Sequence, residues 1–301
     1  MIFLSDLELE LLCRAICLPG EVRAQVCRFH KSAAFASLLP QARPLLEALL
    51  APGTWDSALG RLKERIGEDP RGMKILTFML VCCGQTWDSY QSLGISGDIY
   101  VETLKCFTRF IEEYFESYGT YGFDRDFWTM RQLAARLFRL GALEFELTEE
   151  EGEKTVQVHI PSDADLSSEA RHSSYDAARD FIARFFPAYE KAPFQCTSWL
   201  LSPALKDCLP EDSRIRSFQD EYEVAALFPE RDSFLTWVYK RPDIPAADLP
   251  EDTSLQRNMK KYLLAGKKVG EASGRLLFSK KYEEIKKAAP AKSILPHLPY
   301  F

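Results

Sequence analysis

Long apolar runs are absent from this chain of 301 residues. No run approaches the roughly 18 consecutive apolar residues that a membrane-spanning helix needs. The first ten residues carry acidic side chains where a secretory signal would carry basic ones. These absences predict a cytoplasmic protein that has no membrane partner.

An excess of basic residues is also absent. The chain has 38 lysines and arginines against 44 aspartates and glutamates, which gives a formal net charge of −6. A broad nucleic-acid-binding face needs a basic surplus to neutralise phosphates. We therefore expect no nucleic-acid partner.

Several short motifs that would name a chemistry are missing. None of the eight cysteines forms a CxxC pair, so the spacing of a zinc site is lacking and no metal is expected. Most cysteines lie in apolar runs, which is typical of buried free thiols in a reducing compartment. There is no GxSxG elbow, P-loop or Rossmann fingerprint, which makes a hydrolase the weakest interpretation.

Apolar and aromatic residues are plentiful, at 46% and 12% of the chain, which is enough for two domains with cores. The first 140 or so residues show helical spacing throughout. The clearest helix is expected from Asp98 to Ser117, with an aromatic stripe typical of a core face. A further helix is expected from a cap at Asp124 to Gly141.

The period of the pattern changes from about 3.6 to 2 after residue 141. Residues 143–147 and 155–160 alternate around a turn containing Gly152, which predicts a β-hairpin. A helix is expected over 174–185, and strands over 218–228 and 233–239. The fold class is therefore α+β, with a helical domain over 1–141, a mixed-sheet domain with flanking helices over 142–278, and a peripheral helix or tail over 279–301.

One histidine stands out among the four in the chain. His159 lies on the polar face of the second hairpin strand, just before a loop that carries Ser162 and Asp163. Matching the apolar faces allows two registers. Pairing Phe145 with Val158 places Glu144 opposite His159, and the next register places Glu144 one diagonal away. We therefore predict an acid–base site of His159, Glu144 and Asp163, although His159 as a structural histidine stays an open alternative.

Three other segments are candidate binding sites. Ser162 could hold a substrate or cap a turn. Ser202, before Pro203, is placed as a helix N-cap, and the exposed N–H groups there, with Trp199, could bind a ligand. The basic, glycine-spaced segment 266–274 could hold a pyrophosphate or form a surface loop after a helix.

Six segments, taken in order, resemble a bacterial family of acyltransferase-domain proteins that join an N-acyltransferase N-terminal domain to a GNAT-like C-terminal domain. The resemblance covers residues 1–275 and is carried by 100–110, 121–128, 136–141, 159–166, 198–203 and 249–257.

The resemblance implies acyl transfer from acyl-CoA or acetyl-CoA to a small-molecule amine or a peptide. GNAT enzymes bind the CoA pyrophosphate on a glycine-containing loop between a strand and a helix. The segment that loosely fits this pattern supplies Lys267, Lys268, Gly270 and Ala272, but it is expected to follow a helix. In this interpretation His159 or Glu144 deprotonates the amine, and Trp199 and Ser202 hold the thioester.

The competing hypothesis is a non-catalytic binding or regulatory protein that kept a GNAT-like sheet. The arrangement of the strands distinguishes the two. A splayed pair of parallel strands favours CoA binding, whereas a continuously paired sheet favours the alternative.

Overall fold

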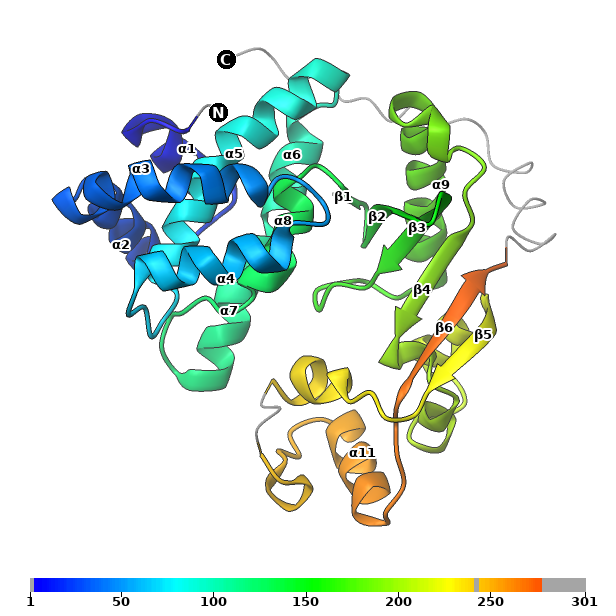
Figure 1. The fold of residues 1–301 in the computed structure, drawn as a ribbon. Coiled ribbons are helices and arrows are strands. Elements are labelled where there is room, and N and C mark those ends of the chain that lie inside the picture. Colours follow the sequence, from blue (N-terminus) through cyan, green and yellow to red (C-terminus); the bar gives the residue numbers. More distant parts are fainter. Residues whose placement is uncertain (1–2, 241–243, 278–301) are drawn as a thin grey trace.

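The N-terminal part of the chain folds into helices that pack around a long buried one. The computed structural model describes residues 3–240 and 244–277, so the tail expected over 279–301 lies outside the described residues. Figure 1 shows the helices gathered on one side of the molecule. They are α1 (Asp6–Ala15), α2 (Gly20–His30), α3 (Ala33–Ala48), α4 (Trp55–Ile66), α5 (Met73–Leu93), α6 (Gly97–Leu104), α7 (Cys106–Tyr118) and α8 (Asp126–Leu133).

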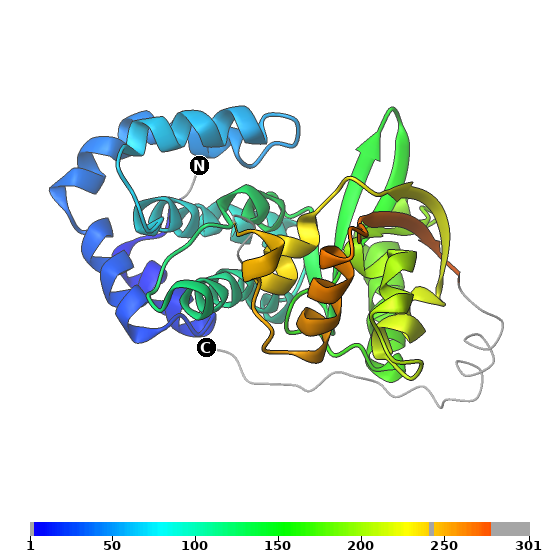
Figure 2. The same ribbon diagram turned by 90° about the horizontal axis from the view of Figure 1, so that it is seen from below.

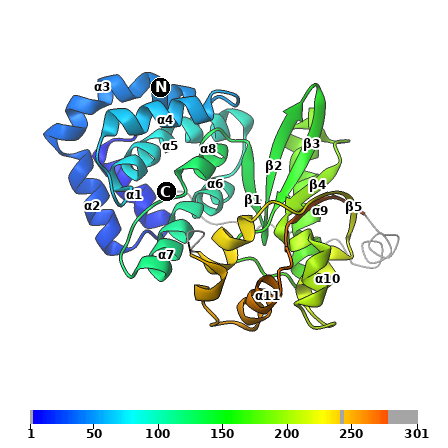
Figure 3. The ribbon, with the colours of Figure 1, turned by 60° about the horizontal axis from the view of Figure 1, so that its bottom comes forward.

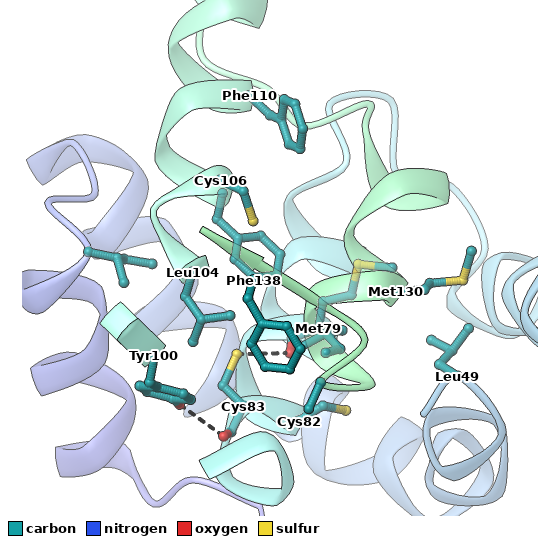
Figure 4. Close-up of a cluster of buried hydrophobic side chains, with 14 of the residues drawn as sticks. Leu49, Met79, Cys82, Cys83, Tyr100, Leu104, Cys106, Phe110, Met130 and Phe138 are labelled. Atoms are coloured by element: carbon teal, nitrogen blue, oxygen red, sulfur yellow. Dashed lines mark hydrogen bonds between the residues drawn. The ribbon is translucent and has the colours of Figure 1, made fainter. Parts of the chain in front are cut away.

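Helix α5 forms the centre of this helical part. Its first half is buried on all sides, as expected of a helix that is apolar around its whole circumference. Cys82 and Cys83 lie there and are fully buried, as is Cys106 of α7, and the hydroxyl of Tyr100 donates to the Cys83 carbonyl at 2.9 Å (Figure 4). Burial raises the pKa of all three thiols. All eight cysteines are free, as the sequence predicted.

Two helix predictions were wrong in their boundaries. The helix expected over 98–117 is divided into α6 and α7 at Lys105, whose ψ of −13° departs from the helical value of about −42°. The helix expected to run from Asp124 to Gly141 is capped at Arg125 and ends at Leu133, because Ala135 takes a positive φ of 49°. Residues 137–140 then form a strand.

The C-terminal part is built on one mixed sheet of six strands in the order β1-β2-β3-β4-β6-β5. Strands β3 and β4 are parallel and all other neighbours are antiparallel. The strands are β1 (Leu137–Leu140), β2 (Leu143–Glu150), β3 (Glu153–His159), β4 (Phe194–Ser198), β5 (Tyr222–Phe228) and β6 (Glu271–Leu276). The predicted hairpin is β2–β3, and its register is the one that pairs Phe145 with Val158 and Glu144 with His159.

The two faces of the sheet meet different partners. Phe145, Val156 and Val158 point to the face covered by α9 (Ser168–Phe185), where Phe145 meets Tyr175 edge-on. The polar face turns toward α7 and α8 of the helical part (Figures 1 and 3). Helix α9 begins six residues earlier than expected because Ser167 caps it through the backbone N–H of Ala170.

The long connection between β5 and β6 forms a separate small core. Phe234, Tyr239 and Met259 are buried together there. The connection lies between the helical part and the sheet (Figure 2). It contains η4, a π-helix (Leu235–Tyr239), η5 (Ala246–Asp248) and α11 (Ser254–Leu264). Shorter elements lie earlier in the chain, namely η1 (Pro187–Tyr189), η2 (Trp199–Leu201), η3 (Pro203–Asp207) and α10 (Arg214–Gln219).

The strand predicted over 233–239 was wrong, because those residues form η4. Aromatic and β-branched residues favour a strand at this position, but β5 is paired to β6 and Phe234 and Tyr239 pack into the small core. The expected strand over 218–228 begins only at Tyr222, because Phe218 belongs to α10.

Candidate active site

The parallel strands β3 and β4 separate shortly after they meet. They pair only at Val156 with Phe194 and at Gln157 with Gln195. Beyond these pairs β3 runs on to His159, while β4 continues to Ser198 against β6 alone. The pair is therefore splayed at its carboxyl ends, which is the arrangement that the sequence analysis named as favouring CoA binding.

A cavity of about 1260 Å³ opens at this separation. Both strands line it, through residues such as His159 and Thr197. Helices α7 and α8 supply Phe110 and Trp128, and the β5–β6 connection supplies Trp237. The cavity thus lies where the helical part, the sheet and the connection meet, and it is larger than the roughly 300–1,000 Å³ of most small-molecule pockets.

His159 faces this cavity and holds a carboxylate, but the carboxylate is Glu146. The His159 Nε2 and Glu146 Oε2 atoms are 2.8 Å apart. Glu144 is directly opposite His159 in the ladder, as predicted, but its carboxylate accepts a hydrogen bond from Arg109 of α7 at 2.8 Å. Glu144 and Glu146 share one face of β2, so the sequence pattern alone could not choose between them.

The Glu146 carboxylate is buried, with 7% of the residue exposed. Burial alone would raise its pKa, but the hydrogen bond and electrostatic interaction with His159 and the nearby Arg131 outweigh burial and hold the pKa below its ordinary value. Arg131 Nε lies 3.2 Å from Glu146 Oε1. The pair is therefore set up with Glu146 ionised and bonded to the imidazole.

The loop after β3, residues 160–167, carries the other predicted polar groups. Ser162 lines the cavity and donates a hydrogen bond to Glu113 of α7. Asp163 pairs with Arg139 at 2.9 Å and with Arg109 at 3.6 Å. Burial would raise the pKa of Asp163, and the two arginines lower it by more. Asp163 is thus placed in a cluster of arginines between the two parts of the chain, and Ser162 at the cavity wall.

Trp199 and Ser202 are neighbours in sequence but not in environment. Trp199 lines the cavity. Ser202 is the predicted N-cap, since its hydroxyl accepts from the N–H of Ala204 at 3.3 Å. That hydroxyl also donates to the carbonyl of Val269, and Ser202 is only 3% exposed. Its hydrogen-bonding groups are therefore used within the fold.

The residues predicted to hold a pyrophosphate lie between α11 and β6, after a helix as the sequence analysis expected. Lys267 pairs with Asp207 at 3.6 Å and Lys268 with Glu230 at 2.6 Å. Ala272 is fully buried in β6, and none of the four predicted residues lines the cavity. The connection that runs from a strand to a helix at the cavity is instead 160–167, between β3 and α9.

Sequence reasoning missed the residues that the helical part contributes. Arg109 and Glu113 lie one turn apart on α7, and Trp128 and Arg131 lie one turn apart on α8. Each pair meets the sheet or its loop across a large separation in sequence. The sequence does show these polar residues at helical spacing next to aromatic ones. Without knowledge of the partner, such residues are interpreted as solvent-exposed.

The fold and the separated parallel strands define an α+β protein with a GNAT-like sheet. The family model of the N-acyltransferase N-terminal domain matches residues 8–135, and that of the GNAT-like C-terminal domain matches residues 137–276. The chain thus belongs to the proteins that join these two domains.

The chain is similar in fold to solved structures of acyltransferases. One, in complex with decanoyl-CoA and teicoplanin, has a TM-score of 0.76 at 24% identity and covers 92% of this chain and 90% of its own. Another, in complex with CoA and 10C-teicoplanin, has a TM-score of 0.77 at 23% identity and covers 93% and 90%. No curated protein matches the chain. Within 3–240 and 244–277, no helix is long and apolar enough to cross a membrane.

Proposed function

We propose that this protein is an acyl-CoA-dependent N-acyltransferase that moves an acyl group from a CoA thioester to an amine. The observation that carries the proposal is the separation of β3 and β4 into a cavity that has His159 and Glu146 on its wall. The matched domains and the acyl-CoA-bound structures of the same fold support the same reaction.

The chemistry needs a base beside the acceptor. Amines are protonated near neutral pH, so a proton must leave before the nitrogen lone pair can attack. In the proposed reaction His159 takes this proton, directly or through a water, and Glu146 stabilises the resulting imidazolium. The amine nitrogen then bonds to the carbonyl carbon, the carbon–sulfur bond breaks, and CoA leaves as a thiolate that takes up a proton.

The edges of the two strands suit the arm of the thioester. Beyond Gln157 and Gln195, strands β3 and β4 no longer pair with each other. The N–H and C=O groups on their facing edges can therefore hydrogen-bond to the amides of a CoA arm placed between them. The strand-to-helix loop 160–167 leads to the N-terminus of α9, where backbone N–H groups favour a phosphate. We propose this loop, and no longer Lys267 and Lys268, as the neighbour of the pyrophosphate.

The acceptor is proposed to be larger than a simple amine. The cavity holds about 1260 Å³, and aromatic side chains of Trp128, Trp199 and Trp237 line it. Two of the structures with the same fold contain teicoplanin or 10C-teicoplanin, so a peptide or glycopeptide amine is a candidate class. A cytoplasmic location goes with the free cysteines.

One observation favours the alternative of a binding protein without catalysis. The loop 160–167 has no glycine and carries Asp163 and Asp165, which repel phosphate. Arg139 and Arg109 pair with Asp163, and Arg214 pairs with Asp165 at 3.2 Å, so these charges are offset within the fold.

Calorimetry with CoA, acetyl-CoA and decanoyl-CoA tests the proposal. We expect saturable binding, with the longer acyl thioester bound more tightly. The Lys267→Ala, Lys268→Ala double variant should bind CoA as the parent does. Loss of CoA binding in that variant would show that the segment 267–272 binds the pyrophosphate. No binding by the parent protein at millimolar CoA would reject the acyltransferase assignment.

A further inference from the structure

The His159–Glu146 pair belongs to the sheet, but helix α8 of the N-terminal domain touches both of its members. Arg131 Nε lies 3.2 Å from one Glu146 oxygen and 3.3 Å from the other. The indole of Trp128 meets the His159 ring at 5.0 Å between centroids, with the ring planes nearly perpendicular at 88°. One helix therefore contacts the carboxylate and the imidazole at the same time.

These two α8 side chains also support each other. Trp128 and Arg131 are three residues apart and share a face of the helix. The Arg131 guanidinium carbon lies 4.5 Å from the Trp128 ring centroid, and its NH1 group donates to the carbonyl of Phe127 at 3.2 Å. Trp55 of α4 lies over the guanidinium as well, at 5.6 Å. Arg131 thus contacts two indoles, a backbone carbonyl and Glu146, and these contacts restrict its side chain.

The β5–β6 connection also contacts Trp128. Trp237 of η4 lies 6.0 Å from Trp128 in an edge-on arrangement. Trp128 is therefore packed by Arg131, His159 and Trp237, which restricts its own rotamers. A ring fixed in this way restricts the imidazole that it contacts.

We infer that Trp128 and Arg131 are positioning residues for the His159–Glu146 pair, and that the N-terminal domain completes the proposed active site. The expected effect on the reaction rate rests on the proposed function, whereas the contacts of Trp128 and Arg131 with the pair do not. Arg131 directs the Glu146 carboxylate at Nε2 and keeps it charged, and Trp128 fixes the plane of the imidazole.

Few charged groups face Glu146, so the effect of Arg131 on the pKa of its carboxylate can be measured. His159 faces it from β3 and Arg131 from α8. Glu144, two residues away on β2, is neutralised by Arg109 of α7. Removing the Arg131 charge removes one cause of the low Glu146 pKa, so that pKa rises toward its ordinary value of 4.5.

The kinetic test compares Arg131→Gln, Arg131→Lys, Trp128→Leu and the parent. We expect Arg131→Gln and Trp128→Leu to lower kcat by about 100-fold, the cost of a small misplacement in an active site. KM for the acyl thioester should change by less than about twofold, because neither residue is proposed to bind it. In Arg131→Gln the acid limb of the kcat/KM profile should move to higher pH, and Arg131→Lys should restore it.

Arg14→Gln is the control for loss of an arginine charge, because Arg14 lies on α1 in an exposed pair with Glu10. The acid limb of the kcat/KM profile of this variant should lie at the same pH as that of the parent. Thermal unfolding of every variant shows whether it is folded, so that a lost fold is not taken for a lost contact.

A measurement that needs no turnover separates this inference from the proposed reaction. The chain has four histidines, so ring proton resonances of His159 can be assigned by difference from His159→Gln. We expect those resonances to move in Trp128→Leu as the indole ring current is lost. Unchanged resonances together with an unchanged pH profile would overturn the inference. If the resonances move in Trp128→Leu but the parent protein transfers no acyl group, the proposed reaction is rejected and the positioning role of Trp128 is retained.

Discussion

His159 and Glu146 form an imidazole–carboxylate pair on the cavity wall, with Nε2 and Oε2 2.8 Å apart. Positioned proton transfer typically contributes about 10²- to 10⁴-fold to a rate. We therefore expect His159→Ala to lower kcat/KM by about that factor. Glu146→Gln should have a smaller effect because the amide keeps a hydrogen bond to the ring. Steady-state kinetics with an acyl-CoA and an amine acceptor measure both, and full activity in His159→Ala would remove the histidine from the mechanism.

The sequence could predict His159 because alternation of period 2 fixes which side of a strand a residue faces. It could also place Glu144 either opposite His159 or one diagonal away, and the observed register is the first of these. It could not predict that Glu146 holds the imidazole. That choice depends on Arg109 of α7 binding Glu144 and on Arg131 of α8 approaching Glu146, and both contacts form only when the helical part packs on the sheet.

Arg171 offers a test of buried charge away from the site. It is fully buried, pairs with Glu221 at 2.6 Å, and donates to the carbonyl of Leu166 at the end of the loop 160–167. Removing Arg171 takes away the arginine partner of Glu221 and leaves it His172 at 3.2 Å and the hydroxyl of Tyr175. We expect Arg171→Met to lower the free energy of unfolding by about 3 kcal/mol. Urea unfolding measures this, and Arg14→Met, in an exposed pair with Glu10, should change it by less than about 1 kcal/mol.

At the level of elements, the segment before β6 has a structural reason for its glycine. Gly270 has a φ of 68°, and a Cβ atom there would lie 2.8 Å from the Cα of Pro229 and 2.9 Å from the carbonyl oxygen of Phe228. Gly270→Ala should therefore destabilise the fold by about 1–3 kcal/mol. Denaturant unfolding provides the measurement.

The matched control is Gly60→Ala in α4, where no atom lies within 4 Å of an added Cβ. In a helix this change should stabilise by about 0.5–1 kcal/mol. If Gly270→Ala weakened CoA binding and left the unfolding free energy unchanged, the glycine would belong to the cofactor site as the sequence first suggested.

Elements with one strong local sequence pattern could be predicted. Elements whose conformation depends on packing against other elements could not. The capping box of Thr253 and Gln256 and the β2–β3 hairpin follow from local residues, and both are present. Residues 233–239 have strand-forming side chains, but Tyr239 and Val238 hydrogen-bond to Gln256 of α11 and Phe234 and Tyr239 pack into the small core, so the segment coils. The single helix expected over 98–117 is interrupted at Lys105, where Thr103 accepts a hydrogen bond from the backbone of Arg139.

For the whole molecule, the contact between the two domains should depend on pH. Glu146 and Asp163 lie at this contact, and both have pKa values lowered from 4.5 and 3.8. A carboxylate with a lowered pKa stabilises the fold above its unfolded pKa, and the contribution is lost as pH falls through the folded pKa. Stability should therefore be constant above about pH 5 and fall below it.

Asp163→Asn should flatten this acid dependence, because the amide does not titrate. Urea midpoints at pH 6, 4 and 3 measure it for the parent and the variant. Equal slopes in the two proteins would show that Asp163 and its arginines contribute nothing to the acid sensitivity.

The strand order has a consequence for synthesis on the ribosome. Strand β6 lies between β4 and β5, although both of these precede it in the chain. While residues 271–276 are still inside the exit tunnel, β5 has no partner and β4 has one bare edge. The emerging chain can form its helices and the β1–β2–β3 meander early. The acyl-transfer cavity that we propose can close only after β6 inserts, so a nascent chain stalled before residue 271 exposes unpaired strand edges to chaperones.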